Sequence, residues 1–500
     1  MNVQTAQKLF REKMDELHAL NHAMGVLYLD GETVAPRASA EGRGRTLEYL
    51  SSRAYEVGTN RALNDAARFL RDHGEELSQL QRREVELFLR ETEFTSKIPQ
   101  AEYVGYTRLL NKASAVWHKA KLENDFDSFA PYIQEIFDTN VRFCRLYKPD
   151  ENPYDVQLGR YERGLTTEKT DAFFGALKER IVPLLRRVLA QPQVDDSFIW
   201  GKTYPAEIQK KFSDYLMDVI CLDKDRCTLG ETEHPFTTNF NKNDVRITTH
   251  YYEQTPVYSM YSVIHEGGHA LYELHTADAL EGTNMAGGVS MSLHESQSRF
   301  LENYIGRSRA FIELIFPKLL ALFPAQFEGV TAGQLWLAVN KAQPSLIRTE
   351  ADELTYALHV LVRYEIEKGL FDGSIRAKDL QTVWNAKYKE YLGIDVPNDR
   401  QGVLQDSHWS QGNVGYFPSY ALGSAYGAQM LAKMKQTVDV EAAVRSGDLR
   451  PVTEWLEQHI WKFGRLYDPM ELLEKALGAP FDPKYFTDYL EEKYTGIYGL

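Results

Sequence analysis

The stretch that decides the fold is YSMYSVIHEGGHALYEL, residues 258–274. Its centre is an HExxH motif that begins at His265 and ends at His269. Residues four apart share one face of an α-helix, so both imidazoles can reach a single metal ion. Glu266 lies about 100° around the helix from His265, beside the open coordination position of such an ion. Since apolar residues flank the motif, the stretch predicts a buried helix that binds a metal.

Two consecutive glycines, Gly267 and Gly268, interrupt this helix. Each costs about 1 kcal/mol relative to alanine inside a helix, so a compensating contact is expected. Close approach of a strand or of a substrate to the helix surface would supply one.

A third metal ligand is expected downstream. A catalytic zinc site uses three protein ligands and keeps a fourth position open. The segment SMSLHESQSRFLENY has helical periodicity and places Glu295 26 residues after His269, beyond a loop at residues 282–288. Glu295 would complete a set of two histidines and one glutamate. His294 competes for the same role, but the two side chains point about 100° apart, so only one of them can face the metal.

Helical periodicity dominates the chain around this centre. The strongest predicted strand is DVRITTHYY, residues 244–252, and a Thr-Thr-Glu signal ending at Glu168 predicts a helix start. We find no internal repeat and no long linker. The sequence therefore predicts a mainly α fold with a small sheet, as one domain over residues 1–500. Before the strand, the predicted helices cover residues 3–29, 77–89, 103–122, 129–146, 171–190 and 206–219.

Composition excludes several classes of protein. Lys plus Arg is 57 and Asp plus Glu is 71, so the charge of −14 disfavours nucleic acid and anionic membrane surfaces as partners. An apolar fraction of 43% supplies a core and argues against disorder. Three cysteines are too few for a disulfide framework and favour a reducing compartment. We assign no function to Cys144, Cys221 or Cys227.

No segment predicts export or membrane insertion. The first residues, MNVQTAQKLFREKM, are polar where a signal peptide is apolar. The most apolar stretch, residues 311–327, contains Glu313, Pro317, Lys318 and Pro324, which do not suit a bilayer. A cytoplasmic location is therefore expected.

Six motifs occur in order along the chain: HPF at His234, DVRIT at Asp244, HEGGH at His265, HESQ at His294, IRTEAD at Ile347 and GVLQDSHW at Gly402. On these motifs the sequence resembles the carboxypeptidase Taq family of zinc metallocarboxypeptidases. The resemblance implies a large helical fold with a deep substrate groove, similar to angiotensin-converting enzyme and neurolysin. Residues 1–145 would line the groove and residues 200–425 would carry the active site. It also implies release of single residues from peptide C-termini, with broad specificity and poor acceptance of proline, by a homodimer.

Carried over by motif, the metal ligands would be His265, His269 and Glu295, and Glu266 would be the catalytic carboxylate. Zinc lowers the pKa of a bound water from about 15.7 towards 7, so Glu266 can accept its proton as the water attacks the peptide carbonyl. Glu266 can then pass the proton to the leaving amine. Co²⁺ or Mn²⁺ could replace Zn²⁺, since availability also decides which metal is bound.

A carboxypeptidase also needs a cation for the terminal carboxylate of its substrate. The planar fork of arginine suits this role, and the motifs supply Arg348 and Arg246, of which we favour Arg348. The alternative for each is an internal ion pair, with Asp352 or Asp244 as the nearby partner.

Other polar residues have weaker assignments. His408, Tyr416 and Tyr420 lie in one glycine-punctuated segment that resembles the substrate segment of angiotensin-converting enzyme, with different spacing. Tyr420 or His408 would donate to the oxyanion, unless these residues only pack. Tyr416 would bind substrate. His234 would hold the substrate backbone from the strand edge, or would be a buried or capping histidine. Glu273 would either orient an imidazole or lie on a solvated helix face.

Two other functions stay open. The first is an oligopeptidase or dipeptidyl carboxypeptidase of the same fold, because the distance from the arginine to the metal is not fixed by sequence. The second is a helical binding protein with a structural metal site. Glu266 argues against the second, since a structural site needs no general base.

Overall fold

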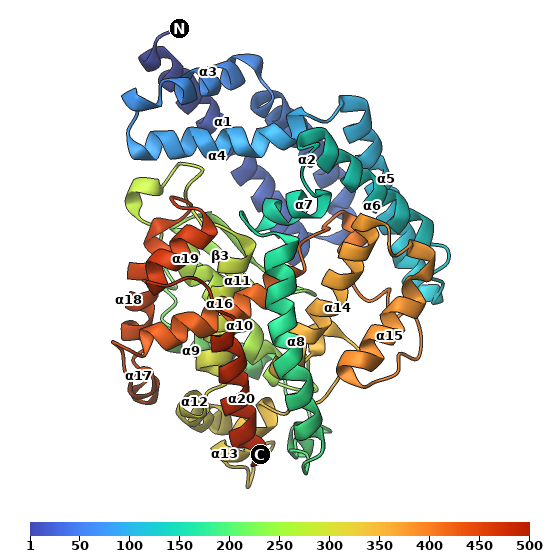
Figure 1. The fold of residues 1–500 in the computed structure, drawn as a ribbon. Helices are drawn as coiled ribbons and strands as arrows, with labels where there is room; N and C mark the ends of the chain where they lie inside the picture. The colour runs from blue at the N-terminus through green and yellow to red at the C-terminus, as the bar shows by residue number, and fades with distance from the viewer.

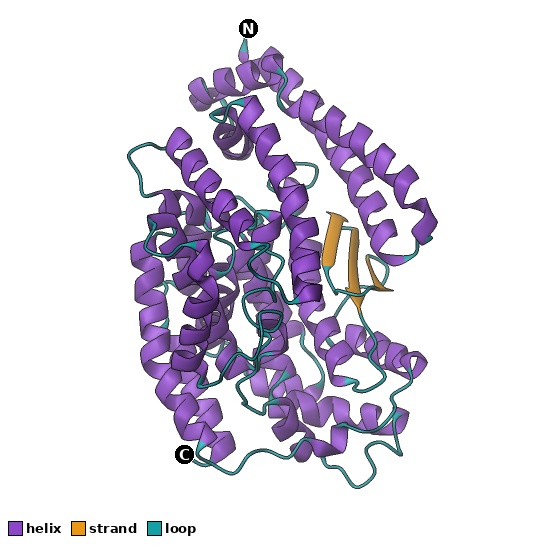
Figure 2. Ribbon diagram, turned by 90° about the vertical axis from the view of Figure 1, so that its right-hand side faces the viewer, coloured by secondary structure: helices purple, strands orange, loops and turns teal.

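The computed structural model describes residues 1–500, and helices make up most of it, with one small sheet (Figures 1 and 2). This confirms the mainly α prediction. In chain order the helices are α1 (Val3–Thr33), α2 (Ala40–Gly58), α3 (Arg61–Asp72), α4 (Gln79–Ser96), α5 (Gln100–Glu123), α6 (Ala130–Tyr147), α7 (Pro153–Tyr161), α8 (Thr167–Leu189), α9 (Ala206–Val219), α10 (Val257–Leu274), α11 (Met291–Arg299), α12 (Arg309–Leu322), α13 (Ala332–Val339), α14 (Glu353–Asp372), α15 (Leu380–Leu392), α16 (Pro418–Met434), α17 (Val440–Ser446), α18 (Arg450–His459), α19 (Pro469–Leu477) and α20 (Lys484–Tyr498).

The N-terminal helices form a layer at the top of the molecule in Figure 1. Helices α1, α3 and α4 bury a small core of their own, which includes Phe10, Leu70 and Phe88. The side chain of Asn2 caps α1. Ser78 and Gln81 form a reciprocal capping box at the start of α4, which satisfies two backbone N–H groups that the helix itself cannot bond.

Helices α7 to α9 lead along the chain from α6 to the sheet. Thr166 caps α8, as the Thr-Thr-Glu signal predicted, and α9 has the predicted bounds. The stretch between α6 and α8 contains the short helix α7, with Pro153 in its first turn, where a missing N–H costs nothing.

The sheet has three strands in the order β1 (Cys227–Glu231), β3 (Asp244–Thr249), β2 (Thr237–Asn241). β1 pairs parallel and β2 antiparallel with β3. The predicted strand is therefore real but ends at Thr249, three residues early, and the chain then continues as a loop to α10. β1 and β2 were not predicted because they are short and only partly buried, so neither has the alternation of a core strand.

The two glycines of α10 face other helices. A Cβ on Gly268 would lie 2.6 Å from the Cα of Ser298 in α11, and a Cβ on Gly267 would collide with Ile220 after α9. The expectation that a strand or a substrate approaches these glycines is thus wrong. Instead α10 and α11 touch backbone to backbone, and this contact compensates for the low helix propensity.

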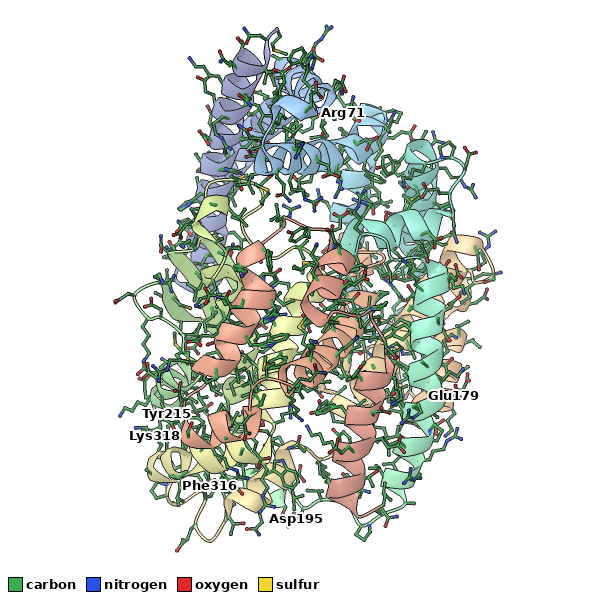
Figure 3. The ribbon with its side chains drawn as sticks, turned by 60° about the vertical axis from the view of Figure 1, so that its left-hand side comes forward. Arg71, Glu179, Asp195, Tyr215, Phe316 and Lys318 are labelled. Carbon is green, nitrogen blue, oxygen red and sulfur yellow. The ribbon has the colours of Figure 1, made fainter.

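The remaining helices surround α10 and α11. The main core contains 103 buried residues and reaches from Ala113 in α5 to Tyr498 in α20. Near the bottom of the molecule in Figure 3, α9 meets α12, and Lys318 Nζ lies 5.7 Å from the ring centroid of Tyr215. The apolar stretch at residues 311–327 is mostly α12, which is a core helix. No helix in the chain has both the length and the apolar character that crossing a bilayer requires.

Candidate active site

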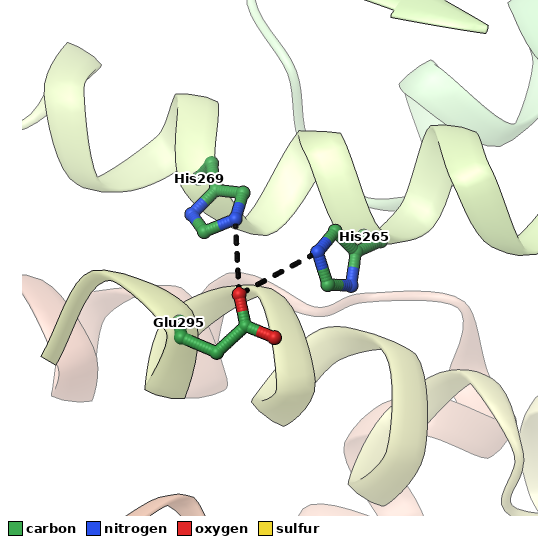
Figure 4. A group of neighbouring side chains, drawn as sticks. All are labelled: His265, His269 and Glu295. Atoms are coloured by element: carbon green, nitrogen blue, oxygen red, sulfur yellow. Dashed lines mark ion pairs between the residues drawn. The ribbon is translucent and has the colours of Figure 1, made fainter. Parts of the chain in front are cut away.

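The structure brings His265 and His269 of α10 together with Glu295 of α11 (Figure 4). Their ligand atoms all lie within 4.8 Å of one another. Glu295 Oε2 is 3.7 Å from His265 Nε2 and 3.5 Å from His269 Nε2. A tetrahedral zinc site with bonds of about 2.1 Å has ligand-to-ligand edges of about 3.4 Å. The donor types and their spacing therefore fit a small divalent metal.

Close helix packing fixes this arrangement. α11 lies against α10 at Gly268, and α16 lies against α11 at Gly423, where a Cβ would be 2.7 Å from Glu295 Cγ. Any side chain at these two positions would push the ligand helices apart. The main chain therefore sets the spacing of the three ligands.

His265 has a carboxylate behind it. Its Nδ1 lies 2.8 Å from Glu302 Oε2, and an ionised carboxylate can only accept, so Nδ1 carries the proton. The lone pair of Nε2 is then free to face the metal. Glu302 belongs to the π-helix η5 (Phe300–Gly306), which continues directly from α11. Arg299 and Arg307 both donate to Glu302, and Arg299 also donates to Glu295 over 2.8 Å.

These ion pairs determine the charge of the two glutamates. Burial alone would raise the pKa values of Glu295 and Glu302, but the buried guanidinium of Arg299 holds both pKa values far below their usual range. Both side chains are therefore anionic, as a metal site requires.

His269 has a longer relay behind it. Its Nδ1 lies 2.6 Å from Nδ1 of His294, whose Nε2 lies 2.6 Å from Glu273 Oε1. Glu273 accepts a hydrogen bond from Nε2–H of His294, so Nδ1 of that neutral imidazole has no proton and accepts from Nδ1–H of His269. The Nε2 lone pair of His269 is therefore left for the metal. The structure thus places His294 behind a ligand. Glu273 is buried, not solvated, and it contacts His294 instead of a ligand imidazole.

Glu266 projects from the same helix and is buried. Thr237 of β2 donates to its Oε2 over 2.6 Å. Burial raises the pKa of Glu266, which makes this carboxylate a better proton acceptor than an exposed glutamate. β2 thus positions the side chain predicted to act as the base.

Arg348 is 5% exposed and lies in the short 3₁₀-helix η6 (Arg348–Glu350). Its Nη2 donates to Asp406 over 2.9 Å and its Nη1 donates to the Tyr356 hydroxyl over 3.1 Å. Asp406 also accepts from Arg363 of α14. The internal ion pair considered for Arg348 from sequence is therefore present, but its partner is Asp406, while Asp352 caps α14. Because two arginines share one aspartate, this cluster keeps an excess positive charge.

Arg246 has a different environment. It lies on β3, where its guanidinium forms two hydrogen bonds of 2.8 Å with Asp244, and its side chain is 35% exposed. This is the internal ion pair considered for it from sequence. His234 is exposed in the turn between β1 and β2, and it precedes Thr237 by three residues.

The three residues of the glycine-punctuated segment lie together. His408 Nε2 is 3.2 Å from the Tyr420 hydroxyl, and the rings of Tyr416 and Tyr420 are 5.0 Å apart. Burial, together with the negative charge of Glu295, raises the pKa of both tyrosines. They therefore keep their protons and can donate hydrogen bonds near the metal ligands. Burial lowers the pKa of His408 to about 4, so this imidazole is neutral.

The sequence and the fold of the chain both match those of known metallopeptidases and carboxypeptidases. Residues 9–494 match the family model described as carboxypeptidase Taq metallopeptidase. The chain is 38% identical over 501 residues to carboxypeptidase 1 of Bacillus subtilis, with 100% of both chains covered. It is 34% identical over 494 residues to thermostable carboxypeptidase 1 of Pyrococcus furiosus, covering 96% of this chain and 97% of the relative. The crystal structure of a carboxypeptidase from Deinococcus radiodurans superposes with a TM-score of 0.95 at 33% identity, covering 99% and 100% of the two chains.

The chain belongs to the carboxypeptidase Taq family. The resemblance drawn from the six motifs is thereby confirmed, and the protein is a metallocarboxypeptidase, a hydrolase that acts on peptide bonds. Its cofactor is a metal ion, and His265, His269 and Glu295 form the one group of metal-ligating side chains that the structure brings together.

Sequence analysis of this metallocarboxypeptidase missed several residues of the site. Arg299 and Glu302 follow Glu295 by four and seven residues, a spacing that places side chains on one face of a helix and could have indicated them. Asp406 was inside a quoted motif but had no assigned role. No local pattern connects it with Arg348, which lies 58 residues earlier in the chain.

Proposed function

We propose that this metallocarboxypeptidase uses Zn²⁺ to release single amino acids from the free C-terminus of peptides, with broad specificity and poor acceptance of C-terminal proline. The observation that carries the proposal is the ligand group. His265, His269 and Glu295 stand at tetrahedral spacing, each with its metal-facing lone pairs left free by the contacts behind it. Co²⁺ or Mn²⁺ would fit the same donor set.

When bound, zinc supplies a Lewis acid that acidifies water and polarises the scissile carbonyl. The residues of the chain do the rest. Glu266, held by Thr237, accepts a proton from the attacking water and delivers it to the leaving amine. Tyr420 or His408 donates to the oxygen of the attacked carbonyl as negative charge develops there.

The substrate carboxylate would bind near Arg348. The excess positive charge that Arg348 and Arg363 share around Asp406 favours an anion, and Arg348 Cζ lies 4.8 Å from the ring of Tyr420. Tyr416, beside Tyr420, would contact the peptide. Arg246 and His234 would make at most peripheral contacts, since Arg246 is paired with Asp244 and His234 is exposed.

The test is mass spectrometry of the products from a mixed set of peptides, with and without a chelator. Loss of one residue at a time from free C-termini, abolished by the chelator, supports the proposal. Release of two residues from a blocked tripeptide would instead indicate a dipeptidyl carboxypeptidase. A bound metal without any hydrolysis would indicate a structural metal site.

The assembly and the compartment are further parts of the proposal. We propose a homodimer in the cytoplasm with peptides as partners, and neither nucleic acid nor membrane as a ligand. The acidic net charge argues against nucleic acid and membrane surfaces, the three unpaired cysteines favour a reducing compartment, and the homodimer is carried by the family resemblance alone. Light scattering of the purified protein would measure the mass of the assembly.

A further inference from the structure

Helix α14 presents a buried polar stripe to the segment that carries His408 and Tyr416. His359, Arg363 and Glu367 are spaced four apart, so they lie on one face, and each is 0% exposed. Arg363 donates to Asp406, which lies two residues before His408, over 2.6 Å. Four residues further along the helix, Glu367 contacts the same segment nearer its end.

Glu367 accepts three hydrogen bonds. The indole Nε1 of Trp409 donates to Oε1 over 2.8 Å. The backbone N–H of Gly415 donates to Oε2 over 2.9 Å, and the hydroxyl of Tyr154 in α7 donates to Oε2 over 2.8 Å. Both carboxylate oxygens are therefore used, and two of the three donors belong to the segment.

The two donors from the segment are the direct chain neighbours of predicted site residues. Trp409 follows His408, and Gly415 precedes Tyr416. The segment has little freedom to adjust at Gly415, whose φ is +83° and whose Cβ position would be 3.0 Å from Gln157 Cγ. Gln157 itself donates to the carbonyl of Val414 over 2.6 Å. Glu367 thus holds the indole side chain on one side of the turn that separates His408 from Tyr416, and the backbone on the other side.

We propose that Glu367 is a positioning residue of the peptidase, which holds the segment from Trp409 to Gly415 so that His408 and Tyr416 face the reacting peptide. The inference rests on the proposed function of those two residues. A donor to a developing oxyanion works only when it is held in place beforehand, and a displacement of about 1 Å can cost on the order of 100-fold in rate.

The chemistry of the contact requires an ionised carboxylate, so the kinetics are measured at about pH 8, above the pKa of about 7 to which burial raises Glu367. The indole N–H and the backbone N–H are donors only, so each needs an acceptor. A glutamine at position 367 would keep one oxygen but would place its NH₂ group against a donor, which leaves one of the two contacts to the segment broken. Glu367→Gln therefore tests the contact with almost no change in volume.

The experiment compares three variants on one free-acid peptide. We expect Glu367→Gln to lower kcat by about tenfold to a hundredfold while KM stays within about threefold, because the chemistry loses its oriented donor and the substrate clamp is intact. Tyr154→Phe is the matched control, since it removes a hydrogen bond from the same carboxylate but not one to the segment, and its kcat should stay within about threefold. Trp409→Phe removes a bond to the segment without touching Glu367 and should lower kcat as Glu367→Gln does. Equal losses in Glu367→Gln and Tyr154→Phe, or full kcat in Trp409→Phe, would overturn the inference.

A spectroscopic measurement separates this inference from the proposed function. The chain has seven tryptophans, and the indole N–H signal of Trp409 in a ¹⁵N-labelled sample is the one absent from Trp409→Phe. That signal or the backbone amide signal of Gly415 should shift and exchange faster in Glu367→Gln, and both should remain in place in Tyr154→Phe. If neither signal moves in Glu367→Gln, the contact is refuted. Failure of the wild-type protein to release amino acids refutes the proposed function instead, and the indole signal would still report on the contact.

Discussion

The site has two sides of opposite electrostatic character. The ligand side comprises α10, α11 and residues 300–307. The tyrosine side comprises the cluster of Arg348, Arg363 and Asp406 and the neighbouring His408, Tyr416 and Tyr420. The ligand side carries more carboxylates than guanidiniums, namely Glu266, Glu273, Glu295 and Glu302 against Arg299 and Arg307. On the tyrosine side the balance around Asp406 is reversed, because Arg348 and Arg363 share it.

This difference shows how one acidic protein can hold two ligands of opposite charge. The chain as a whole carries −14, which disfavours an anionic substrate at long range. Locally, the ligand side suits a divalent cation and the tyrosine side suits a carboxylate.

The largest effect is expected on the ligand side from Glu266→Gln. Removing the proton acceptor should lower kcat by about 10³-fold or more, while the metal content, measured by atomic absorption, stays near one per chain. The ligand atoms themselves are unchanged. If this variant hydrolysed peptides as fast as the wild-type protein, Glu266 would not be the base.

On the tyrosine side, Arg348→Ala should lower kcat/KM for free-acid peptides by on the order of 100-fold, because the substrate carboxylate loses its cationic partner. C-terminally amidated peptides should be affected little. Arg246→Ala is the matched control, since its ion pair with Asp244 is partly exposed and its loss should matter little. Equal losses on acid and amide substrates would show that Arg348 is structural.

The carboxylate behind His265 should tune metal affinity more than catalysis. Glu302→Gln removes the charge that fixes the imidazole, and we expect zinc to bind about 10- to 100-fold more weakly in competition with a chelator. Glu313→Gln, a change to a half-exposed carboxylate on α12, is the control and should leave the affinity as it is. An unchanged affinity in Glu302→Gln would mean that helix packing alone orients His265.

The smallest effect is on stability, through the pH dependence of Glu367. Burial raises its pKa from 4.5 to about 7. Between pH 4.5 and pH 7 the carboxyl of Glu367 is ionised in the unfolded chain and protonated in the folded protein. The free energy of unfolding therefore falls as pH rises, by roughly 3 kcal/mol in all. Below pH 4.5 the effect is absent, and above pH 7 it is complete.

Glu367→Gln lacks this penalty. The unfolding temperature of the variant minus that of the wild-type protein should therefore increase by a few degrees between pH 5 and pH 7.5, measured by calorimetry. Other buried acids, such as Glu162, cancel in the difference. A difference that is flat over this range would show that Glu367 is ionised throughout.

Much of the fold follows from local sequence signals. α8 begins where a capping threonine predicts, because this signal acts within one turn of the helix, and α9 has the bounds that its helical periodicity predicts. β2 is missed because its residues, TTNFN, are polar and half-buried and are defined only by pairing with β3. β2 matters for the site because its Thr237 donates a hydrogen bond to Glu266, and no strand pattern in the sequence indicates this contact.

The residues of the site likewise divide into those that local sequence signals predict and those that only the tertiary structure brings together. The HExxH motif could be predicted from helical spacing, and Glu295 from a return helix together with the family resemblance, since spacing alone left His294 as a competing ligand. Their supporting residues could not all be predicted in this way. Glu302 stands at helical spacing from Glu295 and could have been indicated, but Asp406 reaches Arg348 only through the packing of α14 against a distant loop. Interactions between elements far apart in the sequence depend on tertiary structure.

The contact at Gly268 has a consequence for which ions the protein can select. Because α10 and α11 meet without a side chain between them, the ligand atoms cannot spread without moving whole helices. Calcium, which needs oxygen ligands at about 2.3–2.6 Å and six or more of them, would find the space too small and the donors too few. A methyl group at this position would enlarge that space. We therefore expect Gly268 to favour small divalent ions over larger ones by fixing the distance between the two ligand helices.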